Sequence, residues 1–166
     1  NMAHWIDTET HELFANTRVD SRPRHAEFVA GGSQMWVSSE IGGTITVFNV
    51  EDQSEIAKID FEVQGVHPDR VQPVGFEFTA DETTAFVALG PSNHIAVVNA
   101  ETFEVEDYIL VGRRVWHMDF NGDKSQLFTT NGVSGDVTVI DVASRTALKT
   151  IKVGRFPWGA AYRPTE

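Results

Sequence analysis

The chain has no cysteine, which excludes disulfide bonds, a thiol nucleophile and cysteine-ligated zinc. It is also poor in positive charge, because 13 lysines and arginines stand against 24 aspartates and glutamates and leave a formal net charge of -11. A body with that charge repels a phosphate backbone. Nucleic acid is therefore not an expected partner.

Long apolar runs are missing as well, since none approaches the ~18 residues of a membrane-spanning helix, so we expect no membrane partner. With 41% hydrophobic and 22% charged residues, the composition is that of a folded globular chain, and 166 residues suit one domain. Residues 1–5 contain neither the charged nor the apolar region of a signal peptide and leave export open.

Signatures of common enzyme classes are absent too. The sequence contains no G-x-S-x-G elbow, no H-E-x-x-H pair and no phosphate-binding P-loop. The pairs Gly31-Gly32 and Gly42-Gly43 are expected to be hairpin turns rather than nucleotide cradles. We therefore predict no catalytic residue, no cofactor and no metal ligand, and we favour a noncatalytic protein.

What the chain does have is an internal repeat with a period of 42 residues, lengthened to 50 in the middle repeat. In each copy a short β-branched or aromatic run ends in Asp or Asn, a second run closes in valine, and a third carries an aromatic ring. The equivalent positions are Asp7, Asn49, Asn99 and Asp141; Val19, Val63, Val111 and Val153; Phe28, Phe78, Phe120 and Tyr162. Because Asp and Asn side chains accept hydrogen bonds from the backbone a few residues on, each is predicted to start a turn.

A period of about 42 residues that holds four short strands is typical of a β-propeller blade. We predict an all-β β-propeller of four-stranded antiparallel blades, with the strands of each blade called A to D. Strands A to D of one blade are expected at 24–30, 34–39, 45–50 and 55–63. The complete blades are expected at 21–63, 64–111 and 112–153, and partial blades at 1–20 and 154–166, with a last strand A at 158–163. That makes fifteen strands in a single propeller segment.

This strand count does not close an ordinary ring, and three arrangements remain open. A four-bladed monomer lacks one strand B, whereas two copies that exchange their partial blades close an eight-bladed ring. The start within a blade makes a segment of a longer chain the simplest expectation. We therefore expect self-association, or association with a missing N-terminal half.

Several segments resemble known propeller proteins. Residues 138–141 and 153–157 are similar to the YVTN-type β-propeller repeat. More narrowly, five segments resemble the C-terminal half of β-propeller proteins associated with PQQ-dependent catabolism: Glu40–Thr44, Val87–Pro91, Val111–Trp116, Thr130–Ser134 and Val153–Gly159. The resemblance covers about residue 15 to the end. It implies a longer periplasmic protein whose partner is a quinoprotein alcohol dehydrogenase or a transporter component.

Candidate binding residues gather in the connections from strand D to the next strand A. In an antiparallel blade these connections share one rim with the B–C turns, here called the D–A face. Six of the nine arginines fall in or beside the D–A connections, including the inserted loop at 64–72. Arginine forks suit carboxylates and stack on aromatic rings, so we predict a small anionic ligand or an acidic partner there. The predicted ligand-binding residues are Arg24, His25, Arg113, Arg114, Trp116, His117, Arg155 and Trp158.

A structural role for the same residues remains open. D–A connections pack blade against blade, so arginines there can be held by acids while tryptophans fill the gap between sheets. His25 with Glu27 and His117 with Asp119 are expected to project from one face of equivalent strands, opposite Phe28 and Phe120. Such a set is able to hold a metal or move a proton, or simply to form hydrogen-bonded pairs between blades.

Three functions follow from these observations. The first is a noncatalytic periplasmic binding or scaffold protein that serves PQQ-dependent alcohol oxidation, as the resemblance implies. The second is a metal-dependent hydrolase of the lactonase kind, which the fold alone suggests. The third is a purely structural repeat segment.

Overall fold

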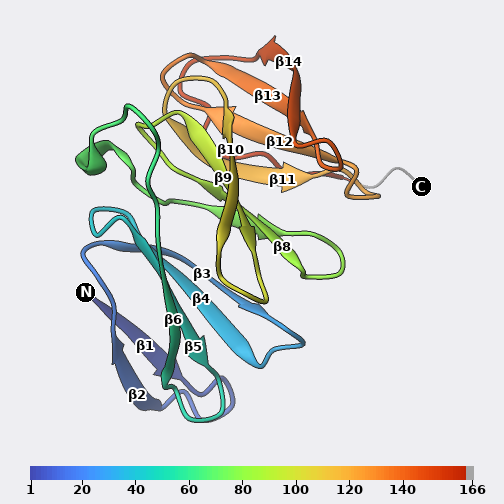
Figure 1. The fold of residues 1–166 in the computed structure, drawn as a ribbon. Coiled ribbons are helices and arrows are strands. Elements are labelled where there is room, and N and C mark those ends of the chain that lie inside the picture. The colour runs from blue at the N-terminus through green and yellow to red at the C-terminus, as the bar shows by residue number, and fades with distance from the viewer. Residues whose placement is uncertain (164–166) are drawn as a thin grey trace.

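The computed structural model describes residues 1–163, which form fourteen strands and one short 3-10 helix. Figure 1 shows three four-stranded sheets in succession, with a two-stranded hairpin beside the first. The hairpin is β1 (Met2–Ile6) and β2 (Leu13–Arg18), and the sheets are β3 (Pro23–Val29), β4 (Gln34–Ser39), β5 (Thr44–Asn49) and β6 (Glu55–Asp60); β7 (Phe76–Phe78), β8 (Thr84–Ala88), β9 (His94–Asn99) and β10 (Val105–Leu110); β11 (Val115–Phe120), β12 (Gln126–Asn131), β13 (Asp136–Asp141) and β14 (Thr146–Lys152). All neighbouring strands pair antiparallel in chain order, which confirms the predicted fold class. None of the described segments is a helix long and apolar enough to cross a membrane.

The repeated Asp and Asn residues start the turns between strands C and D. Their side-chain oxygens accept backbone N–H groups two or three residues on, at 2.7–3.0 Å. Each of these turns also contains one residue in the left-handed region, at the equivalent positions His11, Gln53, Phe103 and Arg145. The turn prediction is therefore confirmed, and the repeat recurs in the backbone dihedrals as well as in the sequence.

Apolar side chains from facing sheets form the core. Trp36 on β4 is fully buried, and its ring meets Phe78 of β7 edge-on at 5.0 Å. Phe86 of β8 and Phe120 of β11 meet in the same way at 5.9 Å between the next two sheets. Burying a ring of this size contributes about 1.5–3 kcal/mol. The sheets are thus stabilised mainly by packing against each other, as blades are.

The A strands β3, β7 and β11 come together along one side of the three sheets. Ser38 Oγ donates to the carbonyl of Val74 at 2.7 Å, and the Gly75 N–H donates to the carbonyl of Trp116 at 3.1 Å. Glu27, Glu77 and Asp119 are at equivalent ladder positions, opposite Trp36, Phe86 and Phe128. Side chains from three different blades are therefore placed next to one another.

The predicted fifteenth strand is wrong within the described residues. The segment that follows β14 contains no strand through residue 163. Thr130 Oγ1 nevertheless donates to the carbonyl of Trp158 at 2.9 Å, which repeats the contact of Ser38 with Val74 two blades earlier. The segment thus occupies the position of a next strand A, but no strand B lies beside it to complete a ladder.

One strand is shorter than predicted. Strand β6 ends at Asp60, whereas the sequence predicted a strand to residue 63. Its partner β5 begins at Thr44, which already pairs with Asp60, so later residues have no ladder partner. The Glu62 N–H instead donates to the Tyr108 hydroxyl at 3.0 Å. The chain then continues into the inserted loop, which contains the 3-10 helix η1 (Pro68–Arg70).

Candidate functional site

A small cavity opens where the three A strands begin on the D–A face. It measures about 200 Å³, and its lining residues are Arg24, His25, Val74, Gly75, Trp116, His117 and Trp158. We call it the rim cavity. Arg24, Val74, Trp116 and Trp158 occupy one repeat position, and His25, Gly75 and His117 occupy the next. The cavity is therefore lined by equivalent residues of successive blades. The backbone confirms that D–A connections and B–C turns share this face, since the N–H groups of Glu40 and Gly132 donate to the carbonyls of Arg22 and Arg114.

Gly75 keeps the cavity open. It stands where the neighbouring blades carry His25 and His117, and a Cβ there would lie 3.1 Å from both the His117 ring and the Trp116 carbonyl oxygen. The glycine allows the backbones of adjacent blades to approach closely. In the sequence, Gly75 interrupts the repeat of histidine at this position. In the structure, the absence of a side chain at Gly75 leaves space between the imidazoles of His25 and His117.

One wall of the rim cavity is a stack of cations and indoles. The rings of Trp116 and Trp158 lie 4.5 Å apart, and Arg24 Cζ lies 5.6 Å from the first centroid and 5.1 Å from the second. Arg114 Cζ lies 4.8 Å from the Trp116 centroid. A Cβ at Gly132 would collide with Trp116 Nε1, so this glycine seats the indole.

Three lining residues carry a buried nitrogen without a hydrogen-bond partner: Arg24 Nη2, His25 Nε2 and His117 Nδ1. A buried polar group left unpaired costs about 1–3 kcal/mol. Three such groups around one cavity are therefore an unusual concentration of unmet hydrogen-bonding capacity. A ligand with hydrogen-bonding oxygens would satisfy them.

Glu40 holds Arg24, which lines the rim cavity, in place. Its side chain is 2% exposed, and its Oε2 lies 3.2 Å from Arg22 Nε and 3.4 Å from Arg24 Nη1. A buried carboxylate of this kind requires its cationic partners. Glu40 is not among the site residues predicted from the sequence. The available signal was its place in a B–C turn, on the same face as the two arginines.

Two residues further along the A strands lie the carboxyl groups of Glu27, Glu77 and Asp119, here called the carboxyl layer. Burial raises the pKa of Glu77 to about 7, and the charges of Glu27 and Asp119 add to the effect. Burial also lowers the pKa of His117, with a further lowering from the charge of His25. Within residues 1–163, no group of three or more histidine or carboxylate side chains has the geometry to hold a metal ion.

The structure brings together five of the eight predicted ligand-binding residues. Arg24, His25, Trp116, His117 and Trp158 line the rim cavity, and Arg114 joins them by stacking on Trp116.

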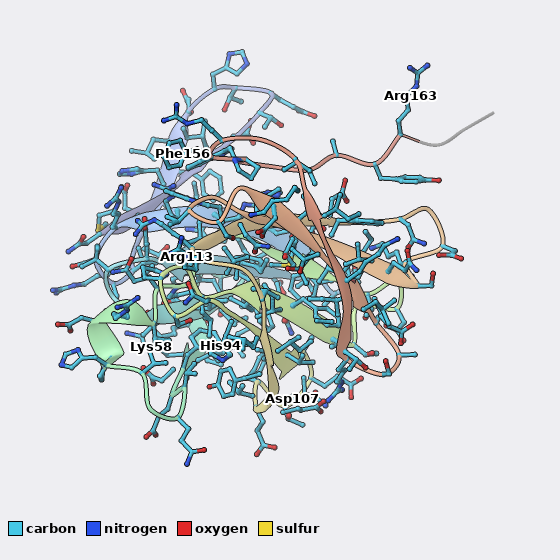
Figure 2. All side chains as sticks on the ribbon, turned by 90° about the horizontal axis from the view of Figure 1, so that it is seen from above. Lys58, His94, Asp107, Arg113, Phe156 and Arg163 are labelled. Carbon is cyan, nitrogen blue, oxygen red and sulfur yellow. The ribbon has the colours of Figure 1, made fainter. Side chains whose placement is uncertain are left out.

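The expectation that Arg113 and Arg155 share this space is wrong. The Arg113 side chain is exposed, and Figure 2 shows this residue on the connection before β11, with Phe156 on the segment after β14. Arg155 lines a separate groove of about 450 Å³ with Lys152 and Phe156. The left-handed backbone of Arg114 turns the chain between Arg113 and Trp116, which sends neighbouring side chains in different directions.

No protein-family model matches the chain, and no curated protein matches its sequence. Solved structures do match. Hydrazine synthase of Kuenenia stuttgartiensis has a TM-score of 0.82 at 19% identity, over 92% of this chain and 43% of that one. U3-55K has a TM-score of 0.70 at 14% identity, over 84% and 42%, and the WD40 repeats of RRP9 have 0.70 at 15%, over 82% and 40%. The chain thus spans less than half the length of these solved chains, and the likeness shows β-propeller, WD40-like blades.

Proposed function

We propose that this chain is a noncatalytic binding segment of a β-propeller, and that it takes a small anion in the rim cavity. The observation that carries the proposal is the set of three buried nitrogens without a hydrogen bond around that cavity, on Arg24, His25 and His117. Arginine and histidine nitrogens are the usual partners of carboxylate oxygens. The indoles of Trp116 and Trp158 add a flat apolar wall beside them.

The size of the cavity limits the ligand. A volume of about 200 Å³ equals the space of roughly six or seven water molecules, at ~30 Å³ each. Pockets for drug-sized ligands start near ~300 Å³. The proposed ligand is therefore a small carboxylate, or the carboxylate end of a larger molecule that protrudes past Trp158.

A hydrolase is the less favoured alternative. A metal-dependent hydrolase needs a set of ligands, and the histidines and carboxylates of residues 1–163 do not provide one. The rings of His25 and His117 lie 6.0 Å apart between centroids, and His25 Nε2 lies 3.7 Å from the carboxylate of Glu27 on its own strand. The arrangement favours binding over hydrolysis.

The biological setting proposed here rests on the sequence resemblance alone. The YVTN-type segments and those similar to PQQ-associated propellers support a periplasmic protein that serves PQQ-dependent alcohol oxidation. Its partner would be a quinoprotein dehydrogenase or a transporter component. An anionic quinone carries carboxylates on a flat ring system, which suits a site built from arginine and tryptophan.

The exposed apolar residues at the two ends support association with further blades. The first hairpin exposes Met2, Ile6, Leu13 and Phe14, and the last strand and the segment after it expose Leu148, Ile151, Val153, Phe156 and Trp158. Blades bury their faces against neighbours, and terminal repeats normally carry polar caps. We propose that a second copy or the remainder of a ring covers these surfaces.

The test of the binding function uses benzoate as probe, titrated into the chain and measured by calorimetry. Arg24→Gln should weaken binding at least tenfold, because it removes a charge-assisted hydrogen bond worth about 1.5–3 kcal/mol. Arg18→Gln is the matched control, since Arg18 is exposed on β2 and its loss changes the net charge equally. Binding should also weaken with added salt and on Arg114→Ala. Equal weakening by Arg24→Gln and Arg18→Gln would contradict the site.

A further inference from the structure

We propose that the rim cavity takes its carboxylate together with a proton, and that Glu77 in the carboxyl layer holds this proton. The proposal rests on the anion-binding function above and names how binding at that site is controlled. It follows from where the carboxyl layer lies, from which carboxyl groups have partners, and from the charges around Glu77.

The carboxyl layer lies directly beside the rim cavity. His25, Gly75 and His117 line the cavity, and Glu27, Glu77 and Asp119 follow two residues later on β3, β7 and β11. Residues two apart on a strand project from the same face, about 7 Å apart. A carboxylate bound in the cavity therefore adds a negative charge next to the carboxyl layer, about 7 Å along the strands from its members.

Of these three carboxyl groups, that of Asp119 accepts a hydrogen bond, and that of Glu27 lies within ion-pair distance of a histidine nitrogen but beyond hydrogen-bond distance. Glu27 Oε2 lies 3.7 Å from His25 Nε2, and Asp119 Oδ2 accepts the Tyr162 N–H at 2.6 Å. The Glu77 carboxyl group has no hydrogen bond or ion pair with any residue of the described chain. Glu77 is also the middle member of the layer, so it feels both neighbours.

The groups that face Glu77 come from every element around it. Glu27 and His25 lie on β3, Asp119 lies on β11, and Lys124 follows in the turn after β11. Lys124 Nζ donates to the Phe78 carbonyl at 2.9 Å, which holds its charge at the far end of β7. Burial is the largest cause that raises the pKa of Glu77 to about 7, and repulsion by Glu27 and Asp119 follows.

An added ligand anion acts in the same direction. Its charge disfavours ionised Glu77, so the pKa of Glu77 rises further on binding and the carboxyl group takes up a proton near neutral pH. By linkage, affinity then falls as pH rises through this range, by up to tenfold per pH unit for one coupled proton. The charge of Arg24 does not neutralise the added anion fully, because Arg24 already pairs with Glu40.

The experiment is calorimetric titration of benzoate into the 166-residue chain at pH 7, in two buffers with different ionisation enthalpies. We expect the apparent enthalpy to differ between buffers as proton uptake requires, and affinity to fall at least fivefold between pH 6.5 and 8. Benzamide, the neutral isostere of benzoate, should cause no proton uptake. Buffer-independent enthalpies with normal benzoate binding would overturn the proton proposal while the anion-binding function stands. Absence of benzoate binding at any pH would overturn both.

Glu77→Gln assigns the proton to its residue. Glutamine keeps the shape and removes the ionisable group, so benzoate should still bind, without proton uptake and with an affinity that is flat between pH 6.5 and 8. Glu55→Gln, an exposed acid on β6, is the matched control and should keep the wild-type pH dependence. A pH dependence that survives in Glu77→Gln would overturn the assignment to Glu77. The two-buffer measurement on the unaltered chain decides the proton uptake independently of how the variant folds.

Discussion

The guanidinium carbon of Arg24 lies 5.1 Å from the indole centroid of Trp158, although the two residues come from opposite ends of the chain. Arg24 is on β3 and Trp158 belongs to the segment after β14. Their contact, and that of Arg24 with Trp116, brings the first and third sheets to one cavity. The binding site is therefore a product of the propeller arrangement rather than of any one blade.

Trp158→Ala should weaken benzoate binding two- to fivefold, because it removes the cation–π contact that positions Arg24 for the ligand. An exposed contact of this kind is worth about 0.5–1 kcal/mol. Trp158 is 59% exposed, so its loss should leave the stability of the chain nearly unchanged. Phe156→Ala removes an aromatic ring that is 67% exposed on the same segment but outside the rim cavity. Calorimetry should find normal affinity in Phe156→Ala, and an equal loss in both variants would rule out the stacking role.

Gly132→Ala should destabilise the chain by about 1–3 kcal/mol, since the new methyl group collides with Trp116 and forces the indole from its place. Gly154→Ala serves as the control, because no atom lies within 4 Å of a Cβ there. Urea unfolding followed by tryptophan fluorescence measures both variants. If Gly132→Ala proved as stable as Gly154→Ala, the Trp116 indole would not pack against Gly132 as the structure shows.

Glu77 makes the stability of the fold depend on pH. Its pKa is about 7 in the folded chain, against an ordinary value of 4.5, so folding favours the protonated form. Well below pH 4.5 the group is protonated in both states and has no effect, whereas the folded state loses stability as pH rises from 4.5 toward 7, because the unfolded chain ionises Glu77 first. The difference in stability between Glu77→Gln and the wild type should therefore grow from pH 5 to pH 8, in favour of the variant. Urea unfolding across that range tests this, and a constant difference would contradict the burial of Glu77.

Self-association is expected for the chain on its own, because large apolar side chains are exposed at both ends of the blade series. Sedimentation velocity over a range of concentrations should show species larger than the 18.4 kDa monomer. A monomer that unfolds cooperatively in dilute solution would instead show that the exposed ends need no cover.

The strands could be predicted closely from the sequence because their limits are set by local turn chemistry. Strand β4 runs from Gln34 to Ser39, as predicted, since glycine turns bound it on both sides. The segment at 158–163 was predicted as a strand A because Tyr162 stands at the repeat position of Phe28, Phe78 and Phe120. A strand also needs a partner, and the ladder beside Trp158 is missing in the described residues.

The site could be predicted only in part. Repeat equivalence correctly mapped His25 onto His117, because that relation is a matter of spacing. The directions of Arg113 and Arg114 depend on the left-handed backbone at Arg114, which no spacing reveals. The environments of Glu40 and Glu77 depend on side chains from other strands and blades, so burial and pairing became visible only in three dimensions.

The measurement that tests the central claim most directly is a titration of benzoate followed by the imidazole NMR signals of the six histidines. If a small anion binds in the rim cavity, the ring nitrogens of His25 and His117 shift together with saturation, because each ring has a buried nitrogen that makes no hydrogen bond before binding. The signals of His67, exposed in the inserted loop, should stay in place. Saturable shifts at His67 or other exposed rings, with His25 and His117 unchanged, would contradict the account.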